Sequence, residues 1–130
     1  MNKTTVAIAD DQTKVRQGIR AMLEAESDIS VVGEAASGLQ ALTLVDETRP
    51  EVLVLDLVLG DISGFEVTKR IRQNSSPTRV IIFSIHWDGK YVLKAQEVGA
   101  SGYVPKKRPH ELAKAIHEVS AGGEYFFDHG

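Results

Sequence analysis

The segment EVLVLDLVLGDISG, residues 51–64, decides the fold class of this chain. Its apolar run VLVL, residues 52–55, is typical of a strand that is buried on both faces of a parallel sheet. Asp56 follows directly. Burying a carboxylate costs on the order of several kcal/mol unless a cation or hydrogen bonds compensate. We therefore expect Asp56 to have a positively charged partner at the end of this strand.

Short apolar runs alternate with segments of helical periodicity along the rest of the chain. The predicted strands are residues 5–9, 31–32, 52–55, 80–83 and 102–104. Between and after them, apolar residues recur at helical spacing in the groups Val15/Ile19/Met22/Leu23, Leu39/Leu42/Val45, Val67/Ile71, Tyr91/Ala95/Val98 and Leu112/Ile116/Val119. This alternation predicts an α/β fold with a doubly wound, five-stranded parallel sheet, and it predicts that all five apolar stripes pack in the core.

Local signals mark several helix ends. The pairs Ser37/Gln40 and Ser63/Glu66 have the capping-box pattern of a helix start. Pro109 suits the first turn of the last helix, and the glycines at 122–123 would end it. We therefore assign residues 1–121 to one domain and residues 122–130 to a C-terminal tail.

The composition fits a single globular domain of 130 residues with a net charge of −3. This charge gives no general reason to expect binding to nucleic acid or to anionic membranes. The absence of cysteine excludes disulfides, thiol catalysis and cysteine metal sites. No stretch resembles a signal peptide or a membrane span, so we expect a soluble, cytoplasmic protein.

Polar side chains follow four of the predicted strands at the point where each strand ends. They are Asp10, Asp11, Asp56, Ser84 and Lys106. Each has an ordinary structural explanation when taken alone, such as a helix cap, a turn or a solvated lysine. In an open α/β sheet, however, the carboxyl ends of the strands meet at one edge, which is where ligands bind. Three carboxylates together repel each other unless cations join them, so this set predicts a Mg²⁺ site, in which Mn²⁺ could substitute.

With these residues and their order, the sequence resembles the receiver domain of two-component response regulators over nearly its whole length. The motifs are the pair Asp10–Asp11, Asp56 after its Val/Leu strand, Ser84 after VIIF, and GYVPK ending in Lys106. The segments IFSIHWDGKYVLKAQEVGASGYVPKK and AIHEVSAGGEYF are most similar to the NarL/FixJ subfamily, whose receivers precede a LuxR-type helix-turn-helix. The resemblance also implies the flavodoxin-like strand order 2-1-3-4-5.

The resemblance implies a role for each site residue. Asp56 would accept a phosphoryl group from a sensor histidine kinase, and Lys106 and Ser84 would contact the phosphoryl oxygens. Asp11, Asp56 and the backbone carbonyl of Val58 would bind Mg²⁺, with Asp10 acting through a metal-bound water. Tyr103 would be the switch residue that turns inward when Ser84 moves; the alternative is a half-buried strand aromatic with its hydroxyl in water.

The sequence departs from the family pattern beside the predicted site. Gly60 stands where many members have proline, and Pro105 precedes Lys106, whereas proline more often follows the lysine. The sequence does not reveal whether the Val104–Pro105 bond is cis or trans.

Two other classes of protein with similar folds fit less well. Hydrolases that form an aspartyl phosphate place an acid two residues after the nucleophile, but here that residue is Val58, which transfers no proton. We therefore expect a regulatory domain that at most takes phosphate from small donors and loses it slowly. Nucleotide- and flavin-binding proteins are disfavoured because the first strand leads into ADDQTKVRQG, which has no glycine-rich phosphate motif.

Two interpretations of the output remain open. In the first, residues 122–130 start a linker to a DNA-binding effector domain, and the chain is the regulatory half of a transcription regulator. In the second, the chain is a stand-alone receiver that binds a protein partner or relays phosphate. We expect no DNA binding by this chain itself, and a homodimer on phosphorylation as a further hypothesis.

Overall fold

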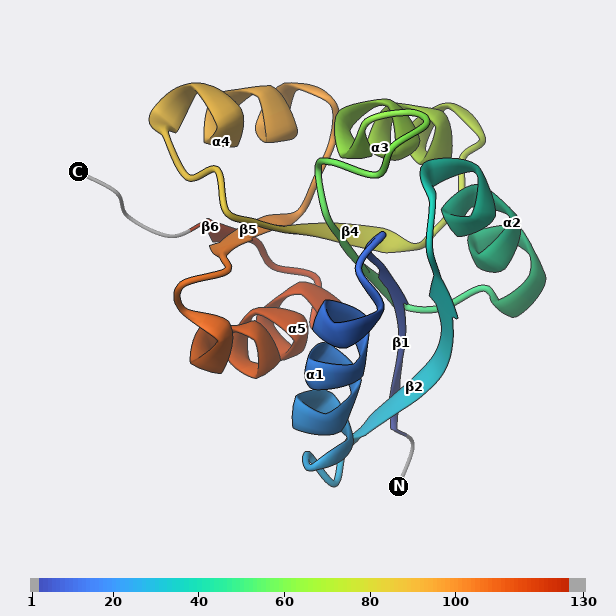
Figure 1. Ribbon diagram of the computed structural model, residues 1–130, viewed down its shortest axis with the longest axis vertical. Helices are drawn as coiled ribbons and strands as arrows, with labels where there is room; N and C mark the ends of the chain where they lie inside the picture. The colour runs from blue at the N-terminus through green and yellow to red at the C-terminus, as the bar shows by residue number, and fades with distance from the viewer. Residues whose placement is uncertain (1–2, 127–130) are drawn as a thin grey trace.

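The computed structural model of the protein describes residues 3–126, which form a parallel sheet covered by helices on both faces (Figure 1). In chain order the elements are β1 Thr4–Ala9, α1 Thr13–Glu24, β2 Ile29–Ala35, α2 Gly38–Thr48, β3 Val52–Leu55, α3 Gly64–Gln73, β4 Arg79–Ser84, α4 Gly89–Glu97, β5 Gly102–Pro105, the 3₁₀ turn η1 Pro109–Glu111, α5 Leu112–Ser120 and β6 Tyr125–Phe126. The predicted doubly wound α/β architecture is confirmed.

The sheet has the order β2-β1-β3-β4-β5-β6, so the predicted order is confirmed and the predicted number of five strands is wrong by one. The additional strand β6 lies parallel to β5, with Tyr125 opposite Gly102 and Phe126 opposite Tyr103. A strand of two residues is too short to show any periodicity, and it falls in the segment that we assigned to a tail. Residues 127–130 of that segment lie outside the described residues, and the division at residue 121 stays a prediction.

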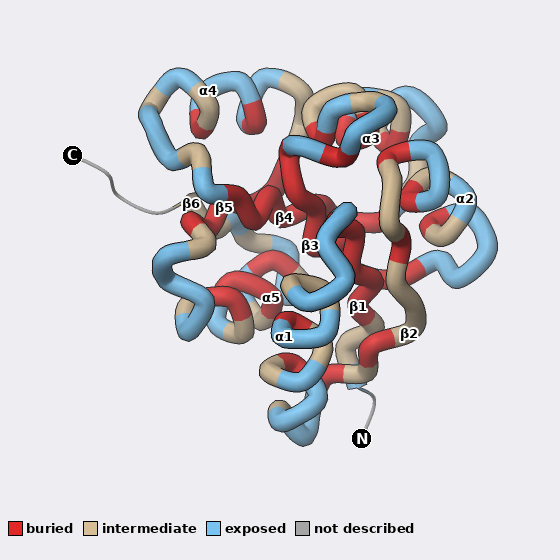
Figure 2. Tube along the Cα trace, in the orientation of Figure 1, coloured by how far each residue is buried: buried red, intermediate tan, exposed pale blue. Residues whose placement is uncertain are grey.

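Side chains alternate across the central strands and build one core on each face of the sheet. In β3, Leu53 and Leu55 pack towards α2, α3 and α4, whereas Val52 and Val54 pack towards α1 and α5. The strands are accordingly buried along most of their length, while the outer faces of the helices are exposed (Figure 2). Each fully buried aliphatic side chain contributes roughly 1.5–3 kcal/mol to folding.

Two apolar side chains predicted to pack in the core, Leu39 and Val98, belong to neither of its two halves. Leu39 in the first turn of α2 is 53% exposed, and the buried residues of this helix are Gly38, Ala41 and Val45. The predicted stripe therefore started on the wrong residue. The face of α2 that packs on the core contains Ala41 and Val45, with Leu42 and Leu44 partly buried beside them.

Both predicted helix caps are present in part. The Ser37 hydroxyl accepts from the backbone N–H of Gln40 at 3.1 Å, and the Ser63 hydroxyl accepts from Glu66 at the same distance. In a capping box, the side chain three residues after the cap also accepts from the backbone N–H of the cap residue. Here that side chain contacts a different group in both helices. Gln40 accepts from the N–H of Ala36, and Glu66 pairs with Arg70.

The start of α2 has a second cap that comes from a distant loop. The carboxylate of Asp61, in the β3–α3 loop, accepts from the N–H groups of Gly38 at 2.8 Å and Leu39 at 2.9 Å. These two hydrogen bonds lower the pKa of Asp61 from 3.8 to about 2. The preceding residue, Gly60, has φ +85°, which proline cannot adopt because its ring holds φ near about −65°. Proline at residue 60 is therefore incompatible with this loop conformation.

We predict that Asp61→Asn lowers the unfolding midpoint by an amount that depends on pH. Because the pKa of Asp61 is lower in the folded protein, the ionised carboxylate stabilises the fold above about pH 4, and this contribution is lost as the pH falls towards about 2. The difference in urea midpoint between wild type and Asp61→Asn should therefore shrink between about pH 5 and about pH 3. Asp46→Asn, on the exposed side of α2, is the control. A difference that does not change with pH would contradict the prediction.

Candidate functional site

The site lies at the carboxyl edge of the sheet, where parallel pairing brings the ends of β1, β3, β4 and β5 together. Ala9 is opposite Leu55, and Ser84 is opposite Pro105. The backbone N–H of Asp56 donates to the carbonyl of Ala9 at 3.0 Å, and that of Lys106 donates to the carbonyl of Ser84 at 2.8 Å. The backbones of residues that are distant in sequence are therefore held next to each other at this edge, as predicted from the positions of the strand ends.

Asp10, Asp11 and Asp56 form a cluster in which one carboxylate oxygen of each lies within 4.8 Å of the others. Asp10 and Asp56 are buried, and Asp11 is exposed. One oxygen of each buried carboxylate accepts a local backbone hydrogen bond, from Gln12 to Asp10 at 2.9 Å and from Leu57 to Asp56 at 2.8 Å. Each buried carboxylate is thereby held in one orientation.

Lys106 supplies the positive partner that we expected for Asp56. Its Nζ lies 2.7 Å from Oδ2 of Asp10 and 3.3 Å from Oδ2 of Asp56. Burial raises the pKa of Asp56, and the charge of Asp10 acts in the same direction while Lys106 opposes it. Burial alone would lower the pKa of Lys106, but its hydrogen bond with Asp10 and the charges of both aspartates raise it overall. The ammonium therefore stays charged at neutral pH.

The donor set fits a hard divalent cation. Three carboxylates face one ammonium, which leaves two negative charges without a balancing charge. All the candidate side-chain ligands are oxygens, and the exposed position of Asp11 leaves room for water ligands, which Mg²⁺ retains in most protein sites. Val58 lies beside the cluster in the β3–α3 loop with its side chain exposed. The role predicted for its carbonyl stays a prediction.

Ser84 and Tyr103 connect this edge to the loop between β4 and α4. The Ser84 hydroxyl accepts from the N–H of His86 at 3.1 Å and forms a hydrogen bond with Tyr103, whose hydroxyl donates to the carbonyl of His86. Tyr103 is fully buried, so the alternative of a hydroxyl in water is wrong. Burial raises the pKa of Tyr103 to about 12. The Tyr103 side chain already lies inward in this conformation.

The β4–α4 loop is held on its outer side by aromatic contacts. The His86 ring stacks on Tyr91 of α4 with 4.9 Å between the ring centroids. Lys107, next to Lys106, places its Nζ 3.6 Å from the centroid of the Trp87 ring. The loop is thus connected to α4 through His86 and to the segment after β5 through Trp87. No cis peptide occurs in residues 3–126, so the Val104–Pro105 bond is trans.

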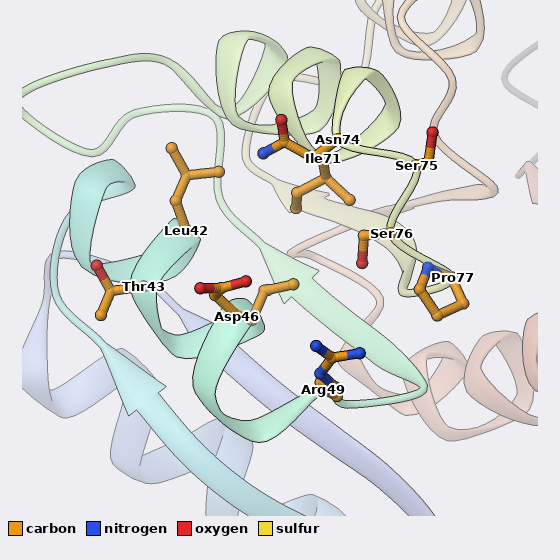
Figure 3. Close-up of a pocket in the computed structure, with 10 residues that line it drawn as sticks. Leu42, Thr43, Asp46, Arg49, Ile71, Asn74, Ser75, Ser76 and Pro77 are labelled. Atoms are coloured by element: carbon orange, nitrogen blue, oxygen red, sulfur yellow. The ribbon is translucent and has the colours of Figure 1, made fainter.

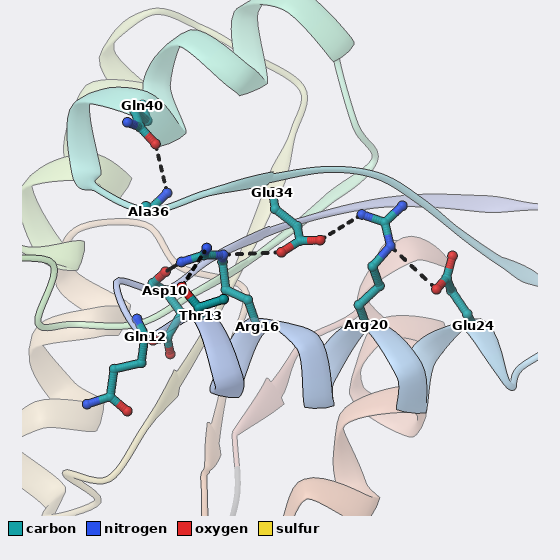
Figure 4. Close-up of polar contacts among 9 residues, drawn as sticks. All are labelled: Asp10, Gln12, Thr13, Arg16, Arg20, Glu24, Glu34, Ala36 and Gln40. Atoms are coloured by element: carbon teal, nitrogen blue, oxygen red, sulfur yellow. Dashed lines mark hydrogen bonds and ion pairs between the residues drawn. The ribbon is translucent and has the colours of Figure 1, made fainter.

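Sequence reasoning missed Arg16, which supports the acidic cluster from α1. Its Nη1 donates to the backbone carbonyl of Asp10 at 2.6 Å, and its Nε pairs with Glu34 at 3.1 Å (Figure 4). Arg20 binds the other oxygen of Glu34 at 2.8 Å, and this hydrogen bond lowers the pKa of Glu34. Arg16 thereby fixes the backbone from which both Asp10 and Asp11 project. No sequence pattern indicated this role, because Arg16 contacts a main-chain atom of Asp10, which any residue type at that position would provide.

A cavity of about 460 Å³ lies at the opposite edge of the sheet, between α2 and the α3–β4 connection (Figure 3). Asp46, Arg49, Asn74 and Ser76 line it together with apolar side chains such as Ile71. It contains none of the strand-end residues. The chemistry of the acidic edge is therefore separate from this cavity.

A comparison with protein families identifies the domain that carries this acidic edge. The family model of the response regulator receiver domain matches residues 6–117. The chain belongs to the response regulator receiver domain family. The predicted recognition is thus confirmed. Receiver domains generally bind Mg²⁺ at an acidic pocket, and this chain has an acidic cluster of Asp10, Asp11 and Asp56.

Among curated relatives, this receiver domain is 37% identical to the uncharacterized transcriptional regulatory protein YhcZ of Bacillus subtilis over 92% of the chain. It is 34% identical over 91% of the chain to the nitrate/nitrite response regulator protein NarL of Escherichia coli. The alignments cover 56% and 55% of those proteins, so the chain spans about half the length of the curated relatives it matches.

Solved structures agree with the fold. A LuxR-family two-component response regulator from Aurantimonas sp. SI85-9A1 superposes with a TM-score of 0.91 at 39% identity, covering 95% of this chain and 89% of that one. The receiver domain of the response regulator NarL from Mycobacterium tuberculosis gives 0.90 at 32% identity, covering 94% and 99%. The similarity to the NarL and LuxR subgroup is thereby confirmed. Within residues 3–126, no helix has the length and hydropathy needed to cross a membrane.

Proposed function

We propose that this receiver domain is a phosphorylation-dependent switch in which Asp56 accepts a phosphoryl group from a sensor histidine kinase. The observation that carries the proposal is the buried Asp56 carboxylate, held 3.3 Å from the Lys106 ammonium within a cluster of three carboxylates. In the reaction, the phosphorus–nitrogen bond of the kinase phosphohistidine breaks, a phosphorus–oxygen bond to Asp56 forms, and the leaving imidazole takes up a proton. Mg²⁺ at the cluster would supply charge neutralisation on the transferring group.

The residues of the chain position and neutralise this group. Asp11 and Asp56, with the carbonyl of Val58, are the proposed Mg²⁺ ligands, and Asp10 acts through a bound water. Lys106 is within reach of Asp56 and would turn from Asp10 to a phosphoryl oxygen. Ser84, at the end of the neighbouring strand, would donate to a second phosphoryl oxygen.

The contacts around Ser84 support the switch. Its hydroxyl binds both the N–H of His86 and Tyr103, so a move of Ser84 towards a phosphoryl group exchanges these bonds. The loop that holds His86 and Trp87 then changes the population of its conformations. Val58 occupies the position of a hydrolytic acid, which favours a lasting phosphoryl group over rapid turnover.

The proposal is tested by intact mass after incubation with Mg²⁺ and a small phosphodonor. The expected result is the gain of one phosphoryl group that disappears with EDTA and in Asp56→Asn. Asp46→Asn, an exposed aspartate on α2, is the matched control and should be phosphorylated like wild type. Incorporation that persists in Asp56→Asn would contradict the assignment of the acceptor.

We further infer that the output is control of transcription through a segment that this chain does not contain. The support is that the chain aligns with about half the length of relatives that are described as transcriptional regulatory proteins. A stand-alone receiver acting on a protein partner or in a relay is the alternative, and the encoding reading frame beyond residue 130 discriminates between the two. Light scattering with and without a phosphate mimic tests dimerisation on phosphorylation.

We predict that the fluorescence of Trp87 reports the switch. Trp87 is the single tryptophan of the chain. It lies in the β4–α4 loop, which we expect to move, and it contacts Lys107. Adding the phosphomimetic BeF₃⁻ with Mg²⁺ should change its emission intensity in wild type, and the change should be absent in Asp56→Asn. Ser84→Ala should reduce it, since the proposed donor to the phosphoryl group is lost. An unchanged response in Ser84→Ala would contradict the role of this hydroxyl.

A further inference from the structure

A second group of metal-ligating side chains lies at the opposite end of the domain from Asp56. Glu26 and Asp28 project from the turn between α1 and β2, and His117 projects from α5. One donor atom of each lies within 4.8 Å of the others. Neither the strand-end motifs nor the proposed phosphorylation chemistry uses any of these residues.

The backbone around these side chains is fixed by hydrogen bonds and by the core. The carbonyl of Asp28 accepts from the N–H of Thr4 at 2.8 Å, and the carbonyl of Glu26 accepts from the N–H of Ile29 at 3.3 Å. Ile29 and Ile116, which adjoin Asp28 and His117 in the chain, are buried in the core between the sheet and helices α1 and α5. The three ligand positions are therefore held by packed elements on both sides.

The imidazole of His117 faces the carboxylate of Asp28. Its Nε2 is screened from solvent and makes no hydrogen bond within residues 3–126, although Oδ2 of Asp28 lies 3.0 Å away. This contact places an imidazole nitrogen and a carboxylate oxygen, two ligand types that Zn²⁺ accepts, side by side. The side chains of His117 and Asp28 are 40% and 52% exposed, so the pair lies at the surface of the domain.

We propose that Glu26, Asp28 and His117 bind a divalent transition-metal cation of the zinc type. Zn²⁺ accepts imidazole nitrogen and carboxylate oxygen together, commonly in tetrahedral sites with three protein ligands and one water. Two carboxylates balance the charge of the ion. The donor atoms lie within 4.8 Å of one another, so side-chain movements of about 1 Å bring them to tetrahedral spacing around a Zn–ligand distance of about 2 Å. The all-oxygen cluster at Asp56 suits Mg²⁺ instead, so the two ends of the domain select different cations.

Such an ion would join the α1–β2 turn to the second half of α5. The segment after α5 leads directly into β6 at the edge of the sheet. The cation would therefore stabilise the folded domain by binding the native arrangement alone. This inference does not depend on phosphorylation of Asp56.

The test is calorimetric titration of the purified chain with Zn²⁺ in excess Mg²⁺, together with the nitrogen NMR signals of the histidine rings. We expect one Zn²⁺ per chain, a selective shift of the His117 Nε2 signal, and an increase in Tm. His117→Gln should weaken binding by at least about tenfold and remove the increase in Tm. Asp28→Asn should weaken binding as well and provides a second variant of an exposed residue. His110→Gln, on the exposed turn η1, is the matched control and should bind like wild type.

Three results would overturn the proposal. The first is Zn²⁺ binding of equal strength in His117→Gln, which would place the ion elsewhere, for example at the Asp56 cluster. The second is one Zn²⁺ per two chains together with a dimer, which would assign the ion to an intermolecular contact. The third is no binding at all in wild type. Because none of these results involves a phosphodonor, failure here is distinguishable from failure of the proposed function.

Discussion

Lys106→Met should destabilise the domain by about 3 kcal/mol in the absence of divalent metal, because it leaves two buried carboxylates without their shared cation. The ammonium lies 2.7 Å from Asp10 and 3.3 Å from Asp56, and no other ion pair in residues 3–126 involves either aspartate. Urea denaturation in EDTA measures the loss. Lys114→Met, an exposed lysine on α5, is the control and should change stability little.

Mg²⁺ and Asp56→Asn should each compensate for the loss of Lys106. A dication at the acidic cluster supplies positive charge, so added Mg²⁺ should stabilise Lys106→Met more than wild type. Asp56→Asn removes one of the repelling carboxylates. Since burial raises the pKa of Asp56, its ionised form destabilises the fold at neutral pH, and Asp56→Asn alone should be more stable than wild type without metal. A Lys106→Met variant that loses no more stability than Lys114→Met would contradict this account of the site.

Gly64→Ala should destabilise the domain by about 2 kcal/mol and reduce phosphorylation of Asp56. A Cβ atom at residue 64 would lie 2.4 Å from the carbonyl oxygen of Asp56 and 3.0 Å from Cα of Leu57. Both are main-chain atoms, so either α3 or the segment that carries Asp56 must shift. Urea denaturation measures the first effect, and the rate of phosphoryl incorporation from a small donor measures the second.

Gly18→Ala is the matched control for this substitution. Gly18 lies within α1, and a Cβ atom there meets nothing within 4 Å. The same change of one methyl group should therefore stabilise the domain by about 0.8 kcal/mol through helix propensity, and it should leave phosphorylation unchanged. Equal stabilities of the two alanine variants would show that the contact between Gly64 and the Asp56 backbone is not restrictive.

The sequence predicted those parts of the domain that follow from short-range pattern and from topology. Apolar runs gave the first five strands and, once the order of a doubly wound sheet was adopted, strand ends gave the meeting of Asp10, Asp56 and Lys106 at one edge. The exact buried face of α2 was not predictable from periodicity, because the exposed Leu39 and the buried Val45 are both apolar.

Contacts between distant segments and main-chain atoms escaped prediction. Arg16 binds the carbonyl of Asp10, and Asp61 binds the N–H groups at the start of α2, 22 and 23 residues away in sequence. Neither contact requires particular residue types at a fixed spacing, so neither leaves a motif in the sequence. Tyr103 was recognised as a candidate switch by its position three residues before Lys106, but its full burial depends on the packing of α4 against β5, which only the assembled fold provides.

The sixth strand makes β5 an interior strand and moves the free edge of the sheet to the last described residues. Phe126 pairs with Tyr103 itself, and Tyr125 is anchored a second time by its hydroxyl, which donates to Glu111 at 2.5 Å. The last described residue, Phe126, therefore lies about 4.8 Å from the backbone of the proposed switch residue. Because Tyr103 and Phe126 are paired in neighbouring strands, a change in the position of Tyr103 can act directly on the segment at residue 126, without passing through the core.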